Sequence, residues 1–222
     1  MKVINPFLRS AAYKKLSSLF TYPENNESYR QFRDEKREIK DIFAELSTEY
    51  DIDFQDDVDS LTSAVDGLSL QDIQVEYVRL FDYRPKCLIV ESAYIYRRDK
   101  STDPEKCASV RDGVEDFYSR FGLETGCWFK QPPDHLSVEL EFMHYLTHQE
   151  GVCMKDESDE VGRYLEGEKE FLSEHLLEWA VGFCDCLRDN SCLSLYSSLA
   201  GITKALLLND ARYLQNLEEV LA

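Results

Sequence analysis

Two ionisable side chains stand out in the segment from Pro133 to Glu150 because they share a helix face with apolar residues. At about 100° per residue, a helix over this segment has one broad apolar face, formed by Leu136, Leu140, Phe142, Met143 and Leu146. His135 and Glu139 fall inside that face and, being four residues apart, can meet on the helix surface. Burying such groups costs free energy unless they are paired or line a pocket. The pattern therefore predicts a buried ion pair, a His that bonds to a backbone carbonyl, or a pocket, and these interpretations stay open.

A second pair of histidines, His144 and His148, is also spaced by four, with Glu141 nearby. The same helical projection places all three on the opposite, polar face, so we expect them to be exposed to solvent. The spacing is not the HExxH arrangement of a zinc protease. We therefore expect no stoichiometric zinc or iron.

The seven cysteines give no better metal set, since their spacing is irregular and no CxxC pair occurs. We interpret them as reduced, mostly buried thiols of a cytosolic protein. They are Cys87, Cys107, Cys127, Cys153, Cys184, Cys186 and Cys192.

Motifs of the common enzyme classes do not occur in the sequence. There is no glycine-rich phosphate loop, no GxSxG and no Cys–His–Asn signature. We therefore predict that the protein is not an enzyme. The enzyme alternative that stays open is a metal-dependent hydrolase using His135, Glu139 and His175.

The elements that must position these residues are predicted to be helices. The 222 residues include only 9 Gly and 6 Pro, fewer than a sandwich or barrel with many tight turns would need. Apolar residues recur at helical spacing along most of the chain. We predict an all-α, single globular bundle of roughly nine to eleven helices.

Caps and breakers give approximate boundaries for these helices. Asn5-Pro6 starts the first, which Tyr22-Pro23 ends; Ser69 caps one that reaches about Phe81, and Asp103-Pro104 opens one that ends near Gly122. The remaining predicted helices span about 27–48, 55–65, 134–150 (closed by Gly151 as a left-handed cap), 160–187, 193–208 and 210–221. Residues 125–133 are predicted to form a loop and residues 153–159 a charged connector. The chain forms one domain over 1–222, with a possible N-terminal subdomain 1–82 and C-terminal subdomain 104–222 joined by a less regular hinge, 83–103.

The charge balance is strongly acidic, with 43 Asp and Glu against 25 Lys and Arg, a formal net charge of −18. This excludes binding to nucleic acid or to an anionic membrane surface as the expected function. It would attract a basic partner. No apolar run is long enough for a membrane helix, and the first 19 residues lack the apolar core of a signal peptide. We expect a cytoplasmic protein without membrane insertion.

The order of four short blocks resembles the TorD/DmsD/NarJ family of redox-enzyme maturation chaperones. These blocks are EYVRLF followed by Pro85, ESAY, PDHLSVELEFM, and FLSEHLLEW with Phe183 after it, and they span about residues 76–183. The block beginning PDHL is the most specific. The segment 82–86 after RLF reads DYRPK without Gly, which departs from many members and weakens any expectation of domain exchange or of GTP binding.

The resemblance implies an all-helical chaperone that binds the twin-arginine leader, or the apo form, of a molybdenum-containing oxidoreductase subunit. Such a chaperone assists cofactor loading, assembly and export of its client. The family's leader-binding block maps here onto Pro133, Asp134 and His135, with Glu91 and Tyr94 from the ESAY block. Leu136 and Glu139 complete the predicted peptide site.

Partners and cofactors are also implied by the resemblance. The expected partner is the molybdoenzyme catalytic subunit or its leader, with the chaperone a monomer or homodimer and no resident cofactor beyond weak GTP or molybdopterin-precursor binding. A NarJ-like assembly chaperone for a membrane-attached cytosolic reductase is the alternative. The physical chemistry agrees, because a leader with two guanidinium groups needs carboxylates such as Asp134 and Glu139 and an apolar groove.

Overall fold

The computed structural model describes residues 3–100, 103–124 and 131–221, and side chains up to 217. In this part of the chain the regular structure is helical, and the β-type pairing is an isolated bridge between Val90 and His135. The predicted all-α bundle of nine to eleven helices is confirmed. The α-helices are α1 (Pro6–Leu19), α2 (Asn26–Asp34), α3 (Lys36–Tyr50), α4 (Gln55–Gly67), α5 (Leu70–Tyr77), α6 (Glu91–Arg98), α7 (Pro104–Arg120), α8 (Leu136–Lys155), α9 (Val161–Phe171), α10 (Leu177–Asn190) and α11 (Ser194–Leu221).

Two π-helical turns interrupt this pattern: η1 (Val78–Asp82) follows α5 directly, and η2 (Leu172–Leu176) joins α9 to α10. Turns of this kind are rare and occur frequently at functional sites, because they re-aim the side chains that they carry. The sequence analysis did not predict either turn.

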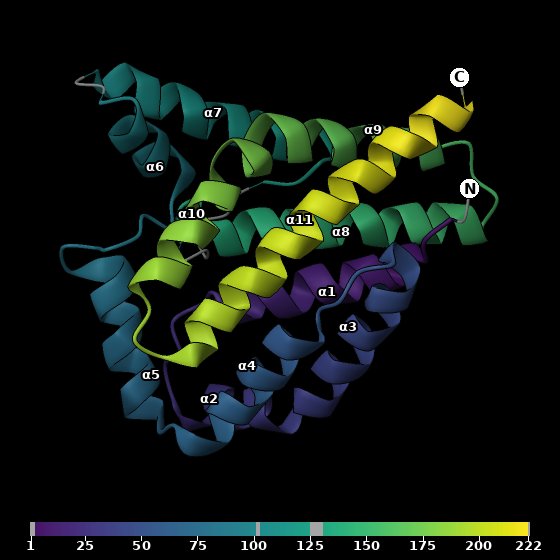
Figure 1. The fold of residues 1–222 in the computed structure, drawn as a ribbon. Coiled ribbons are helices and arrows are strands. Elements are labelled where there is room, and N and C mark those ends of the chain that lie inside the picture. Colours follow the sequence, from purple (N-terminus) through teal and green to yellow (C-terminus); the bar gives the residue numbers. More distant parts are fainter. Residues whose placement is uncertain (1–2, 101–102, 125–130, 222) are drawn as a thin grey trace.

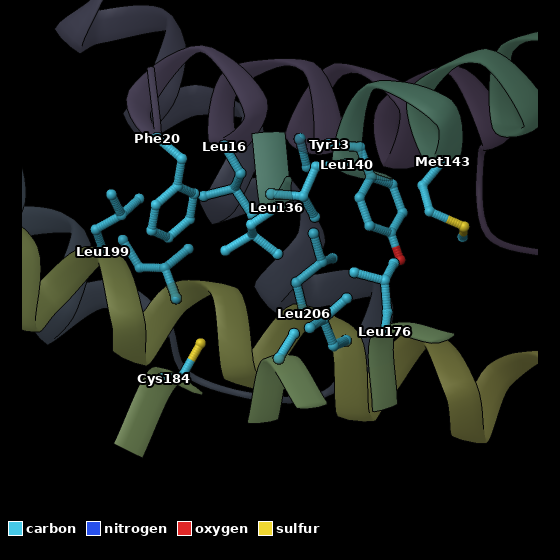
Figure 2. Packing of buried hydrophobic residues seen from close by; sticks show 14 of the residues in the cluster. Tyr13, Leu16, Phe20, Leu136, Leu140, Met143, Leu176, Cys184, Leu199 and Leu206 are labelled. Atoms are coloured by element: carbon cyan, nitrogen blue, oxygen red, sulfur yellow. The ribbon is translucent and has the colours of Figure 1, made fainter. Parts of the chain in front are cut away.

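The core lies where α1, α8 and α11 meet. In Figure 1, α1 and α8 run side by side and α11 crosses them, packing also on α4 and α10. Figure 2 shows apolar side chains from these helices filling the space between them. The labelled side chains are buried: Tyr13, Leu16, Phe20, Leu136, Leu140, Met143, Leu176, Cys184, Leu199 and Leu206. The proposed division into subdomains 1–82 and 104–222 stays a prediction.

Helix starts follow the capping chemistry of the sequence. The Asn5 side chain accepts a hydrogen bond from the Phe7 amide (3.0 Å), with Pro6 as the first helical residue. Ser69 and Asp72 form a reciprocal capping box at the start of α5. Asp103 caps α7 by accepting from the Glu105 amide. These predicted starts are confirmed.

Other predicted boundaries are wrong. The helix predicted over 27–48 breaks at Glu35, where Lys15 of α1 pairs with Glu35 (2.8 Å) and Glu38 (2.7 Å). Conversely, the helices predicted over 193–208 and 210–221 are one helix, α11. The helix continues through Asp210, whose buried carboxylate binds Arg9.

The prediction that Gly151 closes a helix as a left-handed cap is also wrong, since α8 continues through it to Lys155. The Phe7 ring of α1 packs directly over Gly151: a Cβ atom there would lie 2.8 Å from Cζ of Phe7, so a larger residue would make this ring shift. Further along, the predicted hinge 83–103 contains the helix α6, and the predicted loop 125–133 lies mostly outside the described residues.

The expectation of reduced, mostly buried thiols is wrong as well. Cys87 and Cys186 form a disulfide with a Cα–Cα distance of 5.9 Å. Among the other described cysteines, Cys184 is buried, Cys107 and Cys153 are half-buried and Cys192 is exposed; Cys127 lies outside the described residues. Spacing in sequence could not reveal a pair that the fold joins across 99 residues.

Candidate functional site

Of the five side chains marked on α8, three lie as predicted, whereas His144 and Glu141 are half-buried rather than exposed. His135, the N-cap residue, is 2% exposed and Glu139 is 0% exposed, whereas His148 is exposed. The prediction that His144 is exposed is wrong: it is half-buried, and its Nδ1 lies 2.8 Å from the Ser10 hydroxyl. The reason is that α1 lies along this side of α8 and covers His144.

A buried polar cluster surrounds the start of α8. The Glu91 carboxylate lies 2.9 Å from Nδ1 of His175, which η2 carries, and Trp179 Nε1 donates to Glu139 Oε2 (3.1 Å). All four residues are buried. Glu139 therefore does not pair with His135. It contacts Trp179 and Glu91 instead.

Backbone bonds hold the start of α8 against the start of α6. The Glu91 amide donates to the Asp134 carbonyl (2.9 Å), and the Leu136 amide donates to the Ile89 carbonyl (3.1 Å). The Asp134 side chain adds a third bond, accepting from the Ser92 amide (3.0 Å). Asp134 is 1% exposed, so its carboxylate serves this junction.

Burial sets the protonation of the cluster. Desolvation, with a further contribution from the charge of Glu91, raises the pKa of Glu139 well above its ordinary value. Desolvation also raises the pKa of Glu91. A proton on Glu139 satisfies its Oε1, which has no partner as a carboxylate, because it can then donate to Glu91. The pair therefore holds one proton more readily than two exposed carboxyls would.

His135 behaves in the opposite way, since burial lowers its pKa from 6.5 to about 4. The ring stays neutral, and its Nδ1 accepts from the Ser137 amide (3.2 Å). A group whose pKa is depressed on folding stabilises the fold above its unfolded pKa. That stability is lost as the pH falls from about 6.5 to about 4.

The replacement His135→Asn should therefore remove part of the acid sensitivity of the fold while keeping an N-cap acceptor. The pKa difference corresponds to roughly 3 kcal/mol of unfolding free energy lost between pH 6.5 and pH 4, a loss that the variant should not show. Urea unfolding at several pH values measures it. The control is His148→Asn, on the exposed face. Equal pH dependence in His135→Asn and the parent protein would contradict the assignment.

The remaining predicted site residues lie around this cluster, and their role in peptide binding stays a prediction. Pro133 is half-buried and its carbonyl accepts from the Tyr118 hydroxyl (2.8 Å). Tyr94 packs on Trp179, with ring centroids 6.0 Å apart, and Leu136 is fully buried in the core. The structure therefore brings all seven predicted residues to one junction, but it places most of them inside the protein.

An accessible groove runs past this junction. It consists of three cavities of about 410, 540 and 220 Å³. The first and second share Tyr22 and Gln131 as lining residues, and the second and third share Val138 and Glu141, so the three cavities are neighbours. His135 lines the first of them. We call this feature the α8 groove.

The α8 groove has an apolar wall and an acidic lining. Its wall at the first cavity is formed by Tyr77, Val78, Phe81, Ile89 and Val90, from α5, η1 and the strand-like segment before α6. Four carboxylates line the groove, those of Glu24, Asp82, Glu124 and Glu141, and no Lys or Arg occurs among its described lining residues. Such a lining favours an extended ligand with both cationic and apolar groups.

The geometry required by the hydrolase alternative is not found. His135 bonds to Ser137, whereas Glu139 and His175 bond to Trp179 and Glu91, and the three do not converge on one point. Over the described ranges, no group of three or more His, Cys, Asp or Glu side chains is arranged to hold a metal ion.

The largest buried polar network was missed by the sequence analysis. Arg9 of α1 is fully buried and binds three carboxylates, those of Glu150 (2.9 Å), Asp210 (2.7 Å) and Glu168. Tyr13 also donates to Asp210 (2.7 Å). A sequence signal was present, since Arg9 shares its helix face with the apolar positions 12, 13 and 16.

A sequence model of the nitrate reductase delta subunit family matches residues 47–185, more than half of the chain. The chain belongs to this family. It is the TorD/NarJ family that the sequence motifs indicate, so that prediction is confirmed. In the part of this family member that the structure describes, no helix has the length and apolarity to span a membrane.

Relatives of this TorD/NarJ family member are named chaperones. "Chaperone protein TorD" of Shewanella pealeana is 25% identical, covering 96% of this chain and 93% of the relative. The TorD of Vibrio cholerae serotype O1 is 23% identical over 98% and 96%. The "perchlorate reductase assembly chaperone protein" of Dechloromonas aromatica is 35% identical, over 30% and 29%. The family is a chaperone family, and the prediction that the protein is not an enzyme is confirmed.

A solved structure supports the fold. A redox enzyme maturation protein from Archaeoglobus fulgidus superimposes with a TM-score of 0.52 at 20% identity, covering 93% of this chain and 95% of that one. The all-helical architecture is thus shared over nearly the whole length of both chains.

Proposed function

We propose that this TorD/NarJ family member binds the twin-arginine leader, or the apo form, of the catalytic subunit of a molybdenum-containing oxidoreductase. In this role it assists cofactor loading, assembly and export of that subunit. The proposal is supported by full-length similarity to chaperones named TorD and by partial similarity to an assembly chaperone named for perchlorate reductase.

The observation that carries the proposal is the α8 groove. A twin-arginine leader presents two guanidinium groups followed by an apolar, helix-forming stretch. Carboxylates bind guanidinium groups in a bidentate way, and an apolar groove accepts the rest. The exposed Asp82 stands at the first cavity beside the aromatic wall of Tyr77 and Phe81, and the net charge of −18 steers the basic ligand towards it.

The predicted site residues Glu91, Asp134 and His135 keep a place in this proposal. They form the junction beneath the groove, and His135 reaches its lining. Asp134→Ala should remove the partner of the Ser92 amide and let the junction shift, which would weaken leader binding through the shape of the groove. The protein acts in the cytoplasm, as a monomer or homodimer, without a resident cofactor.

The second candidate is a NarJ-like assembly chaperone for a membrane-attached reductase whose client has no working leader; the family description, nitrate reductase delta subunit, favours it. Mass spectrometry of proteins that co-purify with the chaperone identifies the client. The client is then co-expressed with and without its leader. Capture that requires the leader supports the first function, and equal capture of both forms supports the second. A client that is not a redox-enzyme subunit contradicts both.

A further inference from the structure

The disulfide between Cys87 and Cys186 joins the segment that forms one wall of the α8 groove to helix α10. Cys87 lies in the segment between η1 and α6, and its amide donates to the Leu80 carbonyl (3.0 Å). Two residues further on, Ile89 and Val90 line the first cavity of the groove. Cys186 lies on α10, a helix that packs against α11. The bond therefore ties one wall of the groove to the helical core.

The two sulfurs differ in access. Cys87 is fully buried, whereas Cys186 is only partly buried and is the sulfur that an external thiolate can reach. The fold also offers the reduced Cys186 thiol a hydrogen-bond acceptor, because the Lys86 carbonyl lies 3.4 Å from Cys186 Sγ. Neither oxidised nor reduced Cys186 needs a rearrangement of α10.

The neighbouring cysteine does not compete with this pair. Cys184 lies two residues away on α10 but is buried, and desolvation raises the pKa of its thiol to about 12. Since the thiolate is the attacking species, Cys184 is a poor partner for exchange. The exposed Cys192 is the other thiol to be considered in this part of the fold.

We propose that Cys87 and Cys186 are a reversible dithiol–disulfide site that controls how rigidly the wall of the α8 groove is held. In the exchange, a thiolate of an external dithiol attacks Cys186 Sγ, forms a mixed disulfide and releases the Cys87 thiolate, which takes up a proton. The second thiol of the dithiol then displaces Cys186. Two electrons and two protons pass to the protein, and the dithiol leaves as a disulfide.

The consequence for binding rests on the proposed function. With the bond closed, the segment that carries Ile89 and Val90 is held at both ends, so less order has to be gained when a leader binds. With the bond open, this wall is held by the Leu136–Ile89 and Glu91–Asp134 backbone bonds. Leader binding should then weaken by about three- to tenfold.

The site itself is tested on the full chain without any leader. The protein is equilibrated with oxidised or reduced dithiothreitol under native conditions, quenched with acid, alkylated in denaturant so that buried thiols also react, digested and analysed by mass spectrometry. The expected oxidised form yields a peptide linking Cys87 to Cys186, with five of the seven cysteines alkylated; the reduced form yields seven, and reoxidation restores the same link. Seven alkylated cysteines in the oxidised sample, or a link to Cys192 in place of Cys87, would overturn the site.

The coupling to the groove is tested by two readouts. Hydrogen exchange at the amides of Glu91 and Leu136 should speed up on reduction and in Cys186→Ser, but not in Cys192→Ser, while the core amide of Leu61 is unchanged. Calorimetry should show weaker binding of a leader peptide to the reduced protein and to Cys186→Ser, but not to Cys192→Ser. Unchanged exchange at both groove amides would overturn the coupling. Faster exchange with no leader binding in any form would instead overturn the proposed function and leave the redox site standing.

Discussion

Replacing Arg9 with methionine is expected to lower the free energy of unfolding by about 3–5 kcal/mol, because removal of one partner from a buried ion network leaves uncompensated charge behind. Arg9 is fully buried and is bound by carboxylates from α8, α9 and α11. Its replacement therefore removes a contact between α1 and each of these three helices. Urea unfolding followed by circular dichroism at pH 7 measures the loss. The matched control is Arg37→Met, on a side chain that is 93% exposed, which should change stability by less than about 0.5 kcal/mol.

The Arg9 network also predicts a smaller loss of stability for a substitution at Glu168. One guanidinium cannot neutralise three carboxylates, and burial raises the pKa of Glu168 well above its ordinary value and raises that of Glu150 as well. A proton is therefore held in the network. Glu168→Gln, which mimics the protonated acid, should cost far less stability than Arg9→Met. Equal losses in the two variants, or a loss below about 1 kcal/mol for Arg9→Met, would contradict this description.

Sequence patterns were most informative where a local cap decides the structure. Asn5-Pro6 and the Ser69–Asp72 box use side chains within three residues of the bonds that they satisfy, so their effect is visible in the sequence. The errors occur where a distant residue decides. A helix start was predicted at Asp210, but α11 runs through it and its carboxylate binds Arg9, 201 positions away. Gly151 resembles a helix end, but α8 runs through it, where the Phe7 ring of α1 packs over the glycine.

In the candidate site, too, features that depend on one helix could be predicted from the sequence and features that depend on distant residues could not. Helical projection of α8 correctly predicted that His135 and Glu139 point inward. It could not predict that Trp179 and His175 complete the cluster, because the π-helical turn η2 shifts the phase of their helix. The same limit applies to the α8 groove, whose wall combines η1 with the start of α8 and the segment after Phe20. Long-range packing brings these parts together.

The second large expected effect concerns leader recognition. A leader peptide with its Arg-Arg pair should bind at least about tenfold more tightly than the same peptide with Lys-Lys, since only the planar guanidinium makes bidentate bonds to a carboxylate. Truncating one partner of a desolvated charge pair costs roughly 2–5 kcal/mol, more than the 1.4 kcal/mol that corresponds to one decade. Rising salt should mainly slow association, as expected for steering by an acidic protein.

Glu141 does not serve as a neutral control for this effect. It was predicted to lie on a solvent face, yet it lines two cavities of the α8 groove and pairs with Lys14. Asp116, an exposed residue of α7 that does not line the groove cavities, is the better match for Asp82. The two substitutions remove the same charge, one from the lining of the α8 groove and one from outside it.

Titration calorimetry of these two variants with the Arg-Arg leader of the client tests the central claim most directly. Asp82→Asn should weaken binding by about tenfold or more and reduce the preference for Arg-Arg over Lys-Lys, whereas Asp116→Asn should bind like the parent protein. Equal affinities for Asp82→Asn and Asp116→Asn, with the Lys-Lys peptide bound as tightly as the Arg-Arg peptide, would contradict leader recognition in the α8 groove.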